Sequence, residues 1–102
     1  MANLAKVDLR EANVSATDLR RANLREAILV KTDLSKCDLR EANLREAILL
    51  KTDLSRCDLR EANLRDTFMM RANLSNAKVA RGQLAQAKSL EGAIMPDGTK
   101  HD

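Results

Sequence analysis

Apolar residues recur at every fifth position along most of the chain. When the sequence is divided into pentapeptides from Ala2, seventeen consecutive pentapeptides run to Gln86. The third place is Leu in fourteen of them and Val or Met in the other three, and the first place is mostly Ala, with Thr, Cys, Val and Gly in the rest. The second place is mostly Asn or Asp, and the fourth and fifth places are mostly charged or polar. The first and third places of each pentapeptide are therefore the candidate core.

A period of five fits neither regular element of secondary structure. In an α-helix, residues five apart advance by about 140° each time and spiral around the whole cylinder. In a β-strand, an odd period sends successive leucines to opposite faces. The pattern closes if each pentapeptide is a short extended segment, with its first and third side chains on one side, followed by a corner at the fourth and fifth places. We therefore predict a chain that coils around an apolar interior.

A longer period indicates how many sides the coil has. Residues 32–51 and 52–71 differ at seven of twenty positions, and each difference is a mild exchange. Twenty residues are four pentapeptides, so we expect four sides per turn, with equivalent sides stacked on one another. At the usual strand spacing of about 4.8 Å, four to five turns give a rod roughly 20 to 24 Å long. Because a single turn cannot pair its own edges, stability should come from stacking.

The tandem A(N/D)LxX segments resemble the pentapeptide-repeat family over residues 2–86. The resemblance implies an all-β solenoid, a right-handed quadrilateral parallel β-helix of four to five coils, in which the first and third residues point inward. Members are abundant in cyanobacteria and mostly of unknown role. The better understood members are antibiotic-resistance or toxin-immunity proteins that bind DNA gyrase by imitating DNA. Family membership of this kind implies a fold, and the function must be argued from the surface.

The repeat loses phase near the C-terminus. After Leu84, the next strong apolar residues are Leu90 and Met95, which implies one inserted residue. Ile94 would still fit the original phase, so both registers stay open. The Pro-Asp-Gly sequence that follows is typical of a turn.

We predict a single domain over residues 1–98, with a C-terminal cap around 94–98 and a disordered tail at 99–102. No matching cap precedes the first pentapeptide, so the N-terminal strand edge should be unpaired. That edge either stacks on a second copy of the chain or is satisfied by water. The candidate end-stacking side chains are Leu4, Leu9, Val14 and Leu19.

Composition and motifs argue against catalysis. The one histidine, His101, lies in the predicted tail. Packing therefore cannot hold it in a Ser-His-Asp or Cys-His catalytic arrangement. Cys37 and Cys57 are inward, twenty residues apart, and match no zinc or redox spacing, so we predict reduced core thiols. We expect no enzymatic activity, no cofactor and no metal. The absence of a signal peptide or an apolar run of about 18 residues predicts a cytoplasmic protein without membrane contact.

Charge disfavours nucleic acid as a partner. The chain has 18 basic and 15 acidic residues, a net charge of +3, and no Trp or Tyr on which bases could stack. The outward arginines form two columns, each with acidic neighbours, so mutual compensation is expected. A DNA-mimic modulator of gyrase, the alternative function, requires a long and strongly acidic rod, and a weak nucleic-acid binder is the other alternative. The columns are Arg20, Arg40 and Arg60, beside Asp18, Asp38 and Asp58, and Arg25, Arg45 and Arg65.

One side of the predicted coil carries apolar residues at its outward places. Stacking by twenty residues superposes the pentapeptides AILVK, AILLK and TFMMR, whose fifth residues form a basic edge. A contiguous apolar surface with a charged rim is typical of an interaction site; the alternative is a drifted or duplicated repeat. We predict a non-enzymatic protein-interaction or structural scaffold that self-associates through this surface or its N-terminal end, or binds an unknown partner. The surface, called the apolar strip below, consists of Ile28, Val30, Ile48, Leu50, Phe68 and Met70.

Overall fold

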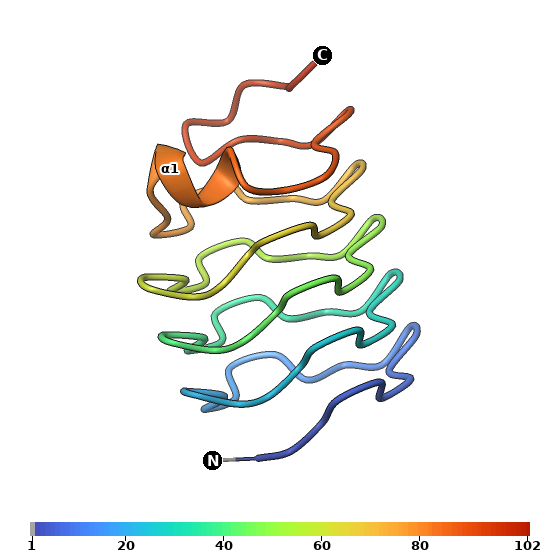
Figure 1. Cartoon of the computed structure of the whole chain (residues 1–102). Helices are drawn as coiled ribbons and strands as arrows, with labels where there is room; N and C mark the ends of the chain where they lie inside the picture. Colours follow the sequence, from blue (N-terminus) through green and yellow to red (C-terminus); the bar gives the residue numbers. More distant parts are fainter. Residues whose placement is uncertain (1) are drawn as a thin grey trace.

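The chain winds into a stack of similar four-sided coils and ends at the opposite end of the stack from where it begins (Figure 1). The computed structural model describes residues 2–102, so Met1, the first residue of the predicted domain, lies outside the described residues. The molecule measures 32 × 23 × 22 Å. Single parallel β-bridges join second-place residues twenty positions apart, as between Asn23 and Asn43. Four such bridges complete a turn, which agrees with the period of four pentapeptides.

Hydrogen bonds between coils account for three of the five backbone N–H groups in most repeats of the inner coils. In the repeat that begins at Ala42, the N–H of Asn43 donates to the preceding coil at 2.9 Å. The N–H groups of Leu44 and Glu46 donate to the following coil at 2.9 and 3.0 Å. Each inner coil is thus tied to both of its neighbours, as expected for a fold whose stability comes from stacking.

The corners depend on left-handed backbone. The first-place N–H of nearly every repeat closes a four-residue turn, as in the 2.9 Å bond from Ala47 to the carbonyl of Leu44. The fifth-place residues have φ between 56° and 63° in every repeat from Lys6 to Asn76. This conformation favours glycine and costs other residues about 1–2 kcal/mol each. Lys, Glu, Arg and Ala occupy most of these positions, so residue type alone does not predict the left-handed conformation.

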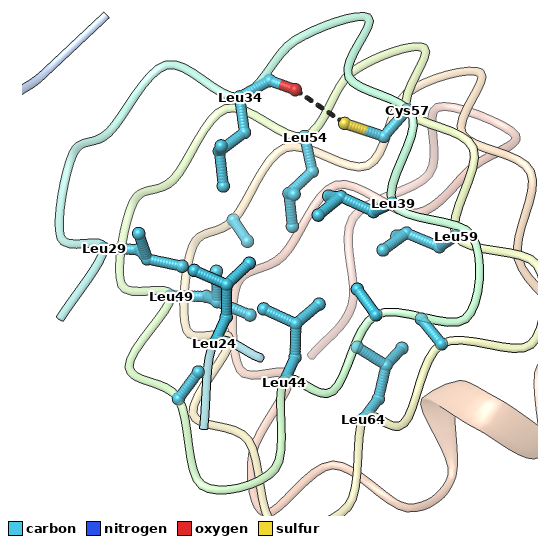
Figure 2. Packing of buried hydrophobic residues seen from close by; sticks show 14 of the residues in the cluster. Leu24, Leu29, Leu34, Leu39, Leu44, Leu49, Leu54, Cys57, Leu59 and Leu64 are labelled. Carbon is cyan, nitrogen blue, oxygen red and sulfur yellow. Dashed lines mark hydrogen bonds between the residues drawn. The ribbon is translucent and has the colours of Figure 1, made fainter. Parts of the chain in front are cut away.

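The interior is filled by third-place leucines and small first-place residues (Figure 2). From Leu24 to Leu74, each third-place side chain is at most 1 % exposed. Polar first-place residues are accommodated by hydrogen bonds to backbone carbonyls, either in the preceding coil or, as for Thr67 and Leu64, in the same turn. The buried hydroxyl of Thr52, for example, donates to the carbonyl of Leu29 at 2.5 Å. The predicted division into inward and outward places agrees with these burials.

A short helix, α1 (Arg81–Leu84), interrupts the repeat and settles the register that follows it (Figure 1). Beyond α1, Ser89 bridges to the residue twenty-one positions earlier, so one extra residue has entered the coil. A helix advances about 1.5 Å per residue and a strand about 3.3 Å, so a helical side needs more residues to reach the next corner. Leu90 and Met95 therefore pack against the core, and Ile94 points outward with 37 % exposure.

The C-terminal segment folds back over the last coil. Ile94 and Lys100 form an antiparallel bridge, and the N–H of His101 donates to the carbonyl of Ala93 at 2.7 Å. These contacts differ from the disordered tail that we expected at 99–102. The reason is that the final coil presents unpaired backbone donors and acceptors, and a chain that turns back immediately after that coil can satisfy them.

Candidate functional site

The apolar strip occupies one side of three consecutive coils. Its second-place residues, Ile28, Ile48 and Phe68, are joined by successive bridges, and its fourth-place residues follow two positions later. All six side chains are half-buried. Each residue stacks on its equivalent in the next coil, and this stacking covers part of the apolar side-chain area that outward places would otherwise expose to solvent. The six residues predicted to share one surface do share it.

Polar residues close the strip at both ends. Below it, the second and fourth places hold Asp8 and Arg10, which form an ion pair at 2.7 Å. Above it, the equivalent positions hold Ser89 and Glu91. The apolar surface is therefore a bounded patch of three coils and not a feature of the whole side.

Second-place Asn and Asp residues have a defined role elsewhere in the coil. Each accepts a hydrogen bond from the fourth-place backbone N–H of its own repeat, as in the 3.1 Å bond from Arg45 to Asn43 Oδ1 and the 3.0 Å bond from Ser55 to Asp53 Oδ1. All twelve second-place Asn and Asp residues make this bond. It is an Asx-type interaction, which explains the preference for these residues at the second place.

The apolar strip lacks these acceptors. Ile and Phe at the second place offer none, and within residues 2–102 the backbone N–H groups of Val30, Leu50 and Met70 have no hydrogen-bond acceptor. A hydrogen bond of this kind contributes about 0.5–1.5 kcal/mol. The apolar second-place residues thus remove one local hydrogen bond in each of three successive coils. The three N–H groups left without an acceptor form a column. We did not recognise these donors from the sequence, although the break in the Asn/Asp pattern marks them.

The two long edges of the strip differ in charge. Beside the donor column, the exposed fifth-place residues make no ion pair with any carboxylate among residues 2–102. On the opposite edge, Glu46 contacts Arg25 at 3.5 Å and Arg45 at 3.6 Å, so acidic charge there is partly neutralised. The unpaired basic edge consists of Lys31, Lys51 and Arg71, and the acidic edge consists of Glu26, Glu46 and Asp66.

The columns of aspartate and arginine on another side compensate each other, as predicted. Arg40 contacts Asp38 at 2.7 Å and Asp58, in the next coil, at 3.8 Å. A hydrogen bond from the neighbouring arginine lowers the pKa of both Asp18 and Asp58 to about 2. No group of three or more potential metal ligands occurs in the described part of the chain. These columns form an ion-pair ladder on the surface.

The two cysteines are free thiols in the core. Cys57 Sγ donates to the carbonyl of Leu34 at 2.7 Å (Figure 2), and Cys37 Sγ donates to that of Val14 at 3.0 Å. Burial raises the pKa of both thiols, that of Cys57 to about 12. Because the thiolate is the reactive form, neither cysteine is suited to nucleophilic chemistry.

The predicted end-stacking residues lie in the first coil, where their side chains are half-buried and pack against the core. They are Leu4, Leu9, Val14 and Leu19. Across residues 2–102, no helix has the length and apolar character needed to cross a membrane.

Comparisons with known proteins agree with this architecture. The family model for pentapeptide repeats matches residues 2–40 and 37–76, with eight copies. Comparison with curated protein sequences gave no match. Among solved structures, the chain is similar to Rfr23, a pentapeptide repeat protein from the cyanobacterium Cyanothece 51142, at 31% identity and a TM-score of 0.77, covering 98% of this chain and 64% of that one.

Two further solved structures extend the comparison. HetL, a pentapeptide repeat protein involved in heterocyst differentiation regulation from Nostoc sp. strain PCC 7120, is 33% identical with a TM-score of 0.56, over 98% of this chain and 52% of HetL. QnrB1, a plasmid-mediated fluoroquinolone resistance protein, is 20% identical with a TM-score of 0.55, over 74% of this chain and 45% of QnrB1, and shares the fold alone. The chain thus spans about half to two thirds of these relatives. Its sequence repeat, its coil and these similarities show that the chain belongs to the pentapeptide repeat family, whose members form right-handed β-helices.

Proposed function

We propose that the chain is a non-enzymatic protein-interaction scaffold and that the apolar strip is its docking surface. The observation that carries the proposal is the loss of the Asn/Asp acceptor in three consecutive coils, which leaves three backbone donors beside six apolar side chains. No compensating bond forms within residues 2–102. A contact with another molecule would supply acceptors for these three N–H groups and cover the apolar side chains.

Divergence among the three coils also supports a role for the strip. Duplication alone would copy the outward residues unchanged, but they vary from coil to coil. Ile48 is replaced by Phe68, and Leu50 is replaced by Met70, yet every replacement is apolar. Retained apolar character at changing positions is the pattern expected of a surface that contacts protein.

Charge favours a protein partner over mimicry of DNA. The net charge is +3, and the aspartate column is paired with arginines throughout the ladder. The likeness to QnrB1 at 20% identity concerns the fold. The arginines of that ladder are likewise engaged with its aspartates, so their charge is already compensated and attracts a phosphate backbone less strongly.

The proposal is tested by changing the strip without disturbing the coil. In the double variant Ile48→Asn/Phe68→Asn, the residue found at the second place elsewhere restores a local acceptor, so folding should be retained. The control is Asp33→Asn/Asp53→Asn, which alters the next side but keeps its acceptors. Sedimentation over a range of concentrations, together with affinity capture and identification of bound proteins, should reveal a complex with wild type and control that the strip variant loses. If all three proteins behave alike, the strip is not a docking surface.

A further inference from the structure

The free donors restrict what can cover the strip. In other repeats the equivalent fourth-place N–H reaches a side-chain oxygen on the outer surface, as in the bond from Arg45 to Asn43. The unpaired N–H groups of Val30, Leu50 and Met70 therefore face the same way, where water can satisfy them in the isolated chain. A purely apolar partner would remove that water and leave three donors buried without acceptors, which is costly. A partner must therefore bring acceptors as well as apolar side chains.

A second copy of the chain meets this requirement poorly. Two strips packed face to face would bring together twelve apolar side chains and six N–H donors, with no acceptor from either strip. The half-burial of the strip residues further reduces the apolar area that a dimer would gain. The lack of acceptors on a second strip therefore favours a different protein as the occupant.

Charge specifies the kind of acceptor. The donor column lies beside Lys31, Lys51 and Arg71, which make no ion pair within the described residues, whereas the opposite edge is partly neutralised by Arg25 and Arg45. Carboxylates facing the donor column would accept from backbone N–H groups and compensate the basic edge at the same time. Hydrogen bonds with an ionised acceptor are stronger than those between neutral groups.

Spacing specifies how the carboxylates are presented. Stacked coils repeat at about 4.8 Å, so the three donors span about 9.6 Å along the solenoid axis. Side chains at positions i, i+3 and i+7 of an α-helix span about 10.5 Å, since each residue rises about 1.5 Å. Three same-side residues of an extended strand span about 13 Å. A helix aligned with the solenoid axis therefore matches the column, and an extended peptide does not.

We infer that the apolar strip binds an acidic amphipathic helix of a partner protein, laid along the solenoid axis. Carboxylates at i, i+3 and i+7 accept hydrogen bonds from Val30, Leu50 and Met70. Apolar residues at i+1, i+4 and i+8, which lie on the adjacent flank of the same helix, cover Ile48 and Phe68. This inference rests on the proposed function, because it specifies the partner of the same surface.

The test uses three designed helical peptides that differ at i, i+3 and i+7, carrying Glu, Gln or Lys, with Leu at i+1, i+4 and i+8 in all. Fluorescence anisotropy with labelled peptide gives the affinities. The Glu peptide should bind wild type at least tenfold more tightly than the Gln peptide, and the Lys peptide should not bind. In ¹⁵N-resolved NMR spectra, the Glu peptide should shift the amide protons of Val30, Leu50 and Met70 downfield.

Three protein variants locate the contact. Lys51→Glu reverses the charge of the basic edge, and the double variant Ile48→Asn/Phe68→Asn satisfies two of the donors internally. Each should weaken binding of the Glu peptide at least tenfold. Lys36→Glu makes the same charge change at the same place of a repeat on the next side, and it should leave the affinity within twofold.

Two outcomes overturn the inference and leave the docking surface in place. In the first, the Lys peptide binds wild type as tightly as the Glu peptide does, and the double variant Ile48→Asn/Phe68→Asn abolishes this binding. The other is binding of no peptide, together with wild-type dimers in sedimentation that the double variant loses. Equal peptide binding by all variants also overturns the inference. The docking proposal itself fails only when sedimentation and capture do not distinguish the strip variant from wild type.

Discussion

Truncation of an inward leucine measures how far the stack depends on its middle coils. Leu39 is fully buried, and its replacement by alanine removes buried methyl groups and leaves a cavity. Such changes cost about 2–5 kcal/mol. With an unfolding entropy of about 2.1 cal/mol/K per residue, a chain of 102 residues should lose about 9–23 °C in melting temperature. Thermal and urea unfolding followed by circular dichroism would measure both quantities.

Two matched variants give this prediction its controls. Leu4→Ala makes the same chemical change in the first coil, where the side chain is half-buried, and should cost less than half as much as Leu39→Ala. Arg40→Ala changes an outward neighbour that forms ion pairs at the surface and should alter stability by no more than about 0.5 kcal/mol. Equal losses at Leu4 and Leu39 would refute the dependence on stacking. A loss at Arg40 comparable to that at Leu39 would refute the assignment of inward and outward places.

Three further predictions concern the corners, the ion-pair ladder and the thiols. Arg56 has a φ of 60°, so Arg56→Gly should raise the free energy of unfolding by about 0.5–1 kcal/mol. Arg65 stands at the fourth place of a later repeat and has no positive φ, so Arg65→Gly should lower the free energy of unfolding by a similar amount. Urea denaturation of both variants decides this. A hydrogen bond from its arginine neighbour lowers the pKa of Asp58 from 3.8 to about 2. This carboxylate therefore stabilises the fold above about pH 4, and its contribution is lost as the pH falls toward 2. The difference in unfolding free energy between wild type and Asp58→Asn should shrink over that range. Cys37 and Cys57 should react with a thiol reagent only after unfolding, with two free thiols per chain in the absence of reductant, and rapid labelling of the folded protein would contradict their burial.

The repeat alone determined most of the architecture. A small first residue and an apolar third residue in every pentapeptide leave one way to bury both, which is a corner every five residues. The period of twenty fixes the number of sides, because equivalent side chains stack only when a whole turn separates them. The burial of Leu44, the outward position of Arg45 and the grouping of the strip around Ile48 all follow from this arithmetic.

The local bond made by second-place Asn and Asp could also have been inferred, because it joins residues two apart and has a well-known geometry. Its absence beside Leu50 becomes informative only in three dimensions. The N–H group of Leu50 lacks an acceptor only if no residue of another coil supplies one. Whether one does can be seen only from the residues that surround it in the folded chain.

The register near the C-terminus was likewise decided by tertiary structure. The sequence allowed both Leu90 and Ile94 as inward residues, and the choice depends on α1, whose helical rise adds a residue to one side of the coil. The same holds for Lys100, which pairs with an edge that exists only once the last coil has formed. Positive φ at Lys36 and at the other corners is also imposed from outside the residue. Hydrogen bonds to the coils on either side hold a conformation that the side chain alone would avoid.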